Sequence, residues 1–184
     1  MPSVLTKQTD GTYLPVSADN PLPMSSTTGK SIKVTVTRPN DTTAYAAGDV
    51  IGSATGSTAA LTFAGVGTAG QLIRILSAKL RIDVSAIPSG MTNFTLHLYN
   101  VTPPSALGDN TAWDLPSGDR ASYLGNIVFD YVQDKGSTLY AKVTDCDEDV
   151  LLSSSSIFAY LVTNAAYTPT AQAVKSITIN AMGV

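Results

Sequence analysis

Residues 31–37, Ser-Ile-Lys-Val-Thr-Val-Thr, decide the fold class of this chain. The apolar residues Ile32, Val34 and Val36 alternate with polar residues, which is the period of a half-buried strand. Three of these seven positions hold valine or isoleucine, whose branched side chains favour strands. The same alternation returns at 94–99, Phe-Thr-Leu-His-Leu-Tyr. We therefore predict an all-β chain.

Similar stretches fill the rest of the chain and are separated by turn-forming residues. The run at 71–84 changes its apolar parity, which predicts a bulge or a bend near Leu76-Ser77. The best helical candidate is the short stretch from Cys146 to Ser153. Roughly eight to ten strands at this length predict a β-sandwich that is jelly-roll-like. The other predicted strands are 43–51, 59–63, 127–131, 139–143, 157–162 and 174–181.

Residues 1–30 differ from the rest and predict an extended N-terminal arm, followed by a β-sandwich domain at 31–184. Prolines at positions 2, 15, 21 and 23 disfavour a helix or a central strand. The arm still carries apolar residues, which suit a segment that lies across a neighbouring surface. The alternative is a flexible terminus whose apolar residues are incidental. The candidate partner-binding residues of the arm are Tyr13, Leu14, Val16 and Leu22.

Composition excludes several classes of partner. Of the 184 residues, 43% are hydrophobic and 14% charged, and the net charge is −3. No run of lysine and arginine exists, so we expect no nucleic-acid partner. The acidic balance and the absence of a long apolar run predict no membrane association and no classical export signal. Cys146 is the only cysteine, and a buried thiol is favoured over a reactive or interchain one.

Catalytic and cofactor motifs are missing from the sequence. His97 is the only histidine, and we interpret it as a solvated residue or one on the surface of a sheet. No nucleophile motif or metal-binding histidine pair accompanies it. Gly29-Lys30-Ser31 lacks the earlier glycine of a phosphate-binding loop. We expect a protein that is not an enzyme and needs no cofactor or metal.

Four acidic residues lie close together near the helical candidate, and they are Asp145, Asp147, Glu148 and Asp149. A solvated acidic cap on a helical turn is the favoured interpretation, through the helix dipole. A weak site for a hard cation such as calcium is the alternative.

Trp113 lies in a long predicted loop at 101–123, near Asp109, Asp114 and Asp119. Three interpretations stay open for this tryptophan. It packs the loop, it contacts another subunit as binding-site tryptophans often do, or it stacks on a sugar beside glycosidase-type carboxylates.

Two segments near the N-terminus resemble a known group of proteins. The first is Leu14-Pro-Val-Ser-Ala-Asp-Asn-Pro-Leu-Pro23, and the second is Val34 to Pro39 together with Thr43-Ala-Tyr-Ala-Ala-Gly-Asp-Val-Ile-Gly52. They look like the openings of tailed-bacteriophage structural proteins, especially capsid decoration (cement) proteins. The resemblance covers about the first 50 residues and has no catalytic residues to transfer.

The resemblance implies a β-sandwich that binds the outside of the head lattice and stabilises it. Its partners would be the major capsid protein and copies of itself, in a trimer or dimer. The location would be the capsid surface of a virion, after synthesis in the host cytoplasm. Two alternatives are another virion accessory protein, such as a head fibre base, collar or tail part, and a glycan-binding β-sandwich module.

Overall fold

A computed structural model describes residues 5–7, 11–15, 29–53 and 58–184 of the chain. Regular structure within these ranges consists of strands alone. In chain order the strands are β1 (Leu5–Lys7), β2 (Tyr13–Pro15), β3 (Gly29–Thr37), β4 (Val50–Ile51), β5 (Leu61–Ala64), β6 (Leu72–Asp83), β7 (Phe94–Tyr99), β8 (Tyr123–Phe129), β9 (Gln133–Asp134), β10 (Thr138–Leu151), β11 (Ser156–Thr163) and β12 (Val174–Gly183).

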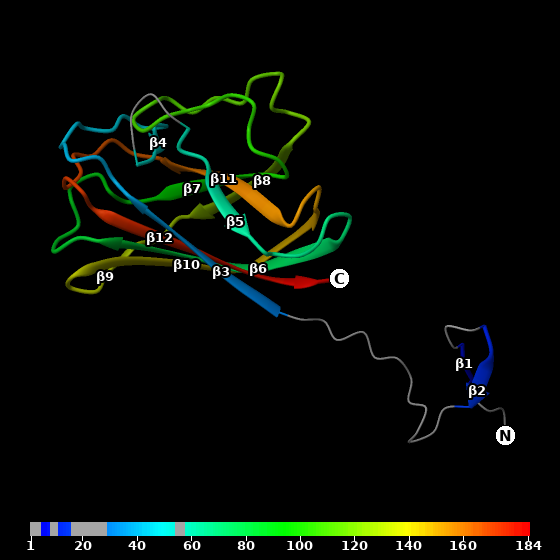
Figure 1. The fold of residues 1–184 in the computed structure, drawn as a ribbon. Helices are drawn as coiled ribbons and strands as arrows, with labels where there is room; N and C mark the ends of the chain where they lie inside the picture. The colour runs from blue at the N-terminus through cyan, green and yellow to red at the C-terminus, as the bar shows by residue number, and fades with distance from the viewer. Residues whose placement is uncertain (1–4, 8–10, 16–28, 54–57) are drawn as a thin grey trace.

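Ten of these strands form two antiparallel sheets that lie face to face (Figure 1). One sheet has the order β3-β12-β6-β10-β9. The other has the order β4-β11-β7-β8, and β5 also pairs with β11. The all-β sandwich predicted from the alternating pattern is confirmed. The apolar residues of each strand meet between the layers, as the alternation requires.

The interior is built from the inward positions of the central strands. Ile73, Ile75 and Leu80 of β6 are fully buried, and so are Phe94 and Leu96 of β7. Burial of such side chains stabilises the fold by about 1.5–3 kcal/mol each. The sandwich therefore has one continuous apolar core between the sheets.

Of the bulge or bend predicted near Leu76-Ser77, the structure shows a bulge. Ser77 pairs with Asn180 and Ile75 pairs with Ala181, so that Leu76 is the extra residue on β6. Odd-numbered residues of β6 face the core before the bulge, and even-numbered residues face the core after it. The bulge therefore reconciles the two apolar patterns within one strand.

The helix predicted from Cys146 to Ser153 is wrong. Most of this stretch belongs to β10, which pairs with β6 and shifts register between Thr144 and Glu148. Asp145 and Asp147 have positive φ values of 60° and 46°, which aspartate tolerates better than most residues. Pairing with β6 resumes beyond the bulge and carries Val150 into the core, where it is 2% exposed. Burial of that side chain favours the strand over a helical turn.

The described part of the arm forms a two-stranded sheet of its own. Leu5 of β1 pairs with Pro15 of β2, and Leu14 pairs with Thr6. Proline lacks a backbone donor and suits the edge strands of such a hairpin. The candidate residues Val16 and Leu22 lie outside the described residues.

Candidate interaction surfaces

The outer face of the β4-β11-β7-β8 sheet is covered by the long loop at 100–122, and Figure 1 shows this loop arching over β7 and β11. Trp113 attaches the loop to the sheet. Its indole ring stacks on the His97 ring, with centroids 3.6 Å apart and planes 13° apart. Its Nε1–H donates a hydrogen bond to the Tyr99 hydroxyl at 3.2 Å. The structure thus places Trp113 in loop packing, with the side chain half-buried.

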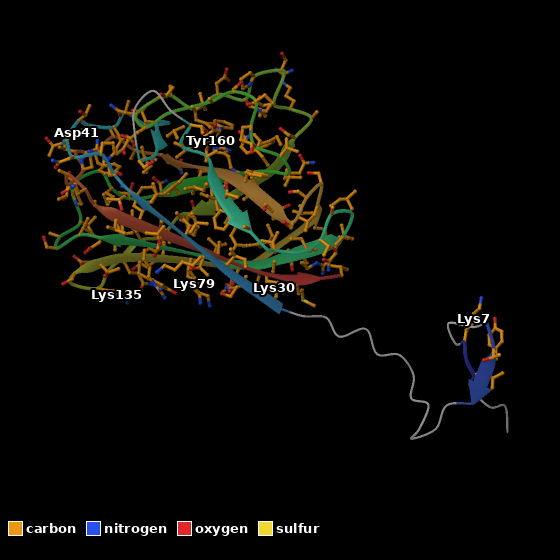
Figure 2. The ribbon with its side chains drawn as sticks, in the orientation of Figure 1. Lys7, Lys30, Asp41, Lys79, Lys135 and Tyr160 are labelled. Carbon is orange, nitrogen blue, oxygen red and sulfur yellow. The ribbon has the colours of Figure 1, made fainter. Side chains whose placement is uncertain are left out.

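A second aromatic residue holds the start of the same loop. The Tyr160 hydroxyl donates to the Ser105 carbonyl at 2.8 Å and accepts from the Leu107 amide at 3.2 Å. Figure 2 shows Tyr160 in the layer beneath the loop. The Tyr160 and Tyr99 rings meet edge to face, 5.8 Å apart. Because its backbone bonds to sheet side chains, the loop belongs to the folded domain.

His97 lies on the surface of a sheet, as one of the two alternatives predicted, but the alternative of a solvated residue is wrong. It lies on the outer face of β7, but the loop covers it and leaves it 7% exposed. Its Nδ1 is 3.0 Å from the Tyr123 hydroxyl. Burial disfavours the charged ring and lowers the pKa of His97 to about 4.

We expect the free energy of unfolding to fall as the pH drops from about 6.5 to about 4. In this window the unfolded chain binds a proton at His97 that the folded chain does not bind, which favours unfolding. The loss reaches at most about 3 kcal/mol. Urea denaturation at pH 7 and pH 4.5 would measure it, with His97→Gln as the control in which this part of the pH dependence disappears. An equally steep loss in that variant would contradict the assignment.

The three carboxylates near Trp113 have separate partners. Asp109 is 3% exposed and accepts hydrogen bonds from the Tyr45 hydroxyl at 2.6 Å and the Gly52 amide at 2.7 Å. Asp119 is also buried and accepts from the Ser105 amide at 3.2 Å. Asp114 is exposed and accepts from the next amide in the chain. Two of the three therefore satisfy buried backbone or hydroxyl donors in the way structural carboxylates do.

A buried polar cluster surrounds Asp109, and no single motif or period in the sequence indicates it. Arg38 is 2% exposed, and its Nε donates to the Tyr45 hydroxyl at 2.9 Å. Its Nη2 lies 3.9 Å from Asp109 Oδ2. Tyr167 packs its ring 5.2 Å from that of Tyr45, and Lys175 is fully buried nearby on β12. Asp109 Oδ2, the Tyr167 hydroxyl and Lys175 Nζ have no hydrogen-bond partner among the described residues.

The four acidic residues at 145–149 lie on the β10 bulge and the strand after it, so the interpretation as a helical cap is wrong. Asp149 forms a two-point ion pair with Arg74 on the neighbouring strand, at 2.7 and 2.8 Å.

Cys146 is half-buried, and burial raises the pKa of its thiol. Across the described ranges, no group of three His, Cys, Asp or Glu side chains is arranged to hold a metal ion. Nor does any helix in the described residues have the length and apolar character to cross a membrane.

The open side of the sandwich lies where β3 meets β5. β3 is an edge strand that pairs with β12 along one side. Its residues Ile32 and Val34 pack against the core but remain partly exposed. A groove of about 530 Å³ begins at Val34 and is lined by residues 34–37, by Ser53 and by residues 58–62 around β5. This side therefore offers both unpaired strand backbone and partly exposed apolar side chains.

No protein-family model matches the chain, and no curated protein matches it either. Several solved structures are similar at low levels. A bacterial lipoprotein from Bacteroides thetaiotaomicron has a TM-score of 0.39 and 10% identity, covering 84% of this chain and 83% of that one. A chain of the Israeli acute paralysis virus particle has a TM-score of 0.31 and 11% identity over 100% and 92%. A chain of the Macrobrachium rosenbergii nodavirus particle has 0.25 and 15% over 88% and 95%.

Proposed function

We propose that the chain is a non-enzymatic structural protein of a virion, of the capsid decoration type, which binds the outside of a head lattice and stabilises it. The observation that carries the proposal is the long free edge of β3, bordered by the groove toward β5 and preceded directly by the arm. The resemblance of the first 50 residues to phage structural proteins points the same way.

The β3 edge is built to accept another strand. It is nine residues long, and edge strands of stable monomers are usually short, bulged or covered. An added strand gains main-chain hydrogen bonds along the edge, and pockets beside it receive alternate side chains. The partly exposed Ile32 and Val34, together with the groove, provide such pockets.

The arm is the segment we assign to that edge, in a neighbouring copy. Leu5 and Tyr13 of its hairpin are 52% and 60% exposed, and burial of these side chains would favour assembly. A trimer or dimer follows if the arms are exchanged around a closed ring. The major capsid protein is the second partner in this proposal.

Deleting residues 1–28 tests the proposal. Every strand of the two large sheets lies after this segment, so we expect the shortened chain to keep its melting temperature within about 2 °C. Binding to purified heads of the virus that encodes the chain, measured by co-sedimentation, should weaken at least about tenfold. The full-length variant Leu5→Ser/Tyr13→Ser should show part of the same loss. Undiminished binding by the shortened chain would reject the role of the arm.

A further inference from the structure

The outer face of the β3-β12-β6-β10-β9 sheet brings together cations that are dispersed in the sequence. Lys33 on β3 lies opposite Thr178 on β12, which lies opposite Lys79 on β6. Lys79 in turn lies opposite Lys142 on β10. Arg81 follows in the next outward position of β6, and Figure 2 shows Lys79 on the side of this sheet that faces away from the other layer. We call Lys33, Lys79, Arg81 and Lys142 the basic row.

The basic row lacks acidic partners. No ion pair among the described residues includes any of its four members, whereas Arg74 on the same face is neutralised by Asp149. Asp83, at the end of β6, is the one acidic residue of that strand. Lys79 and Lys142 lie directly opposite each other, and like charges in that arrangement destabilise a sheet. An unneutralised row on a chain of net charge −3 points to a binding role.

Exposed leucines share this face with the basic row. Leu72 of β6 and Leu151 of β10 pair in register and are 39% and 60% exposed. Leu76, the bulge residue of β6, is 38% exposed. A flat surface that combines apolar side chains with surrounding charges is typical of protein–protein interfaces.

We propose that this outer face docks on an acidic protein surface, with carboxylates against the basic row and an apolar contact at Leu72 and Leu151. The inference rests on the proposed function for the identity of the partner, which would be a lattice subunit. Charge complementarity would speed the encounter and fix its orientation, and the leucines would supply burial.

Carboxylates suit the basic row better than phosphates do. Phosphate sites commonly use arginine forks or free backbone amides. Here β12 and β6 pair with neighbours on both sides, so that their amides are largely occupied. Arg81, the one arginine of the row, lies 5.9 Å from the centroid of the Tyr140 ring. The same contact places Arg81 over one face of the Tyr140 ring. A nucleic-acid base would need a free aromatic face on which to stack.

Binding to immobilised poly-L-glutamate at 50 mM NaCl tests the face directly. We expect wild-type protein to bind, to lose binding as salt rises to 300 mM, and to weaken about tenfold in Lys79→Glu/Lys142→Glu. That variant replaces one like-charged pair by another, so its melting temperature should stay near the wild-type value. The matched control Thr111→Glu/Ser117→Glu/Arg120→Glu has the same change in charge, at exposed residues of the loop on the other sheet, and should bind within about twofold of wild type.

Three results would overturn the inference. They are no binding of wild-type protein to poly-L-glutamate, an equal loss in both variants, and tighter binding to a 20-nucleotide oligothymidylate or to phosphatidylglycerol vesicles. Failure of the proposed function is read separately. If wild-type protein binds poly-L-glutamate through Lys79 and Lys142 but does not bind heads, the docking face is supported and the decoration role is rejected.

Discussion

Replacing Asp109 with alanine is expected to lower the free energy of unfolding by about 3–5 kcal/mol. The carboxylate accepts hydrogen bonds from the Tyr45 hydroxyl and the Gly52 amide inside the fold. It also lies near the fully buried guanidinium of Arg38. Its removal leaves two buried donors without an acceptor, while Arg38 loses its buried counter-ion and keeps the partly exposed Asp41, 2.9 Å from its Nη2. Each unsatisfied donor costs about 1–3 kcal/mol, which makes this loop residue as important as a core residue.

Urea denaturation at pH 7 would measure the effect. Asp109→Asn keeps an oxygen acceptor of similar shape and should lose less, about 1–3 kcal/mol. Asp114→Ala removes an exposed carboxylate from the same loop and should change stability by less than about 0.5 kcal/mol. A loss below about 1 kcal/mol for Asp109→Ala would contradict the dependence of the Tyr45 hydroxyl and the Gly52 amide on this carboxylate.

Replacing Lys175 with methionine is expected to raise the free energy of unfolding by about 1–3 kcal/mol at pH 7. Lys175 is fully buried, and its Nζ has no hydrogen-bond partner among the described residues. Burial, together with the charge of Arg38, lowers the pKa of Lys175 to about 8. At pH 7 the folded protein therefore bears the cost of a buried ammonium that the unfolded chain keeps in water. Methionine fills a similar volume without that charge.

The same group makes a prediction about alkaline pH. Between about pH 8 and pH 10.5 the unfolded chain retains the Lys175 proton while the folded chain loses it. Stability of the wild-type protein should therefore rise over the lower part of this window, below the range in which tyrosines ionise. The rise should be absent in Lys175→Met, as denaturation at pH 7 and pH 9.5 would show. A methionine variant that is less stable than wild type would contradict the account of this cluster.

The strands were predictable where one face is apolar and the other polar. Residues 31–37 and 94–99 lie in β3 and β7, because the alternate apolar side chains face the core and so fix the strand and its face. In β7 the polar positions are buried as well, under the loop at 100–122. The parity change in 71–84 located the bulge at Leu76 for the same reason. The β10 bulge escaped prediction, because acidic residues there interrupt the alternation that continues at Val150.

The candidate surfaces were less predictable because they depend on pairing between distant strands. Lys175 is two residues before Ile177 on β12 and therefore shares its inward face. The alternation of this strand in the sequence is thus sufficient to indicate a buried lysine. Asp109 lies in an irregular loop, where no period indicates burial. The basic row arises from the register of β3, β12, β6 and β10, which composition and motif searches do not specify. Its members are dispersed along the chain, so no run of lysine and arginine marks it.

The molar mass of the full-length chain in solution, from size-exclusion chromatography with light scattering, tests the central claim most directly. An assembly protein that exchanges its arm onto the β3 edge of a neighbour should elute as a dimer or trimer. The chain that begins at Gly29 should elute as a monomer near the mass of one domain. Equal, monomeric masses for both chains over the micromolar range would contradict arm-mediated assembly.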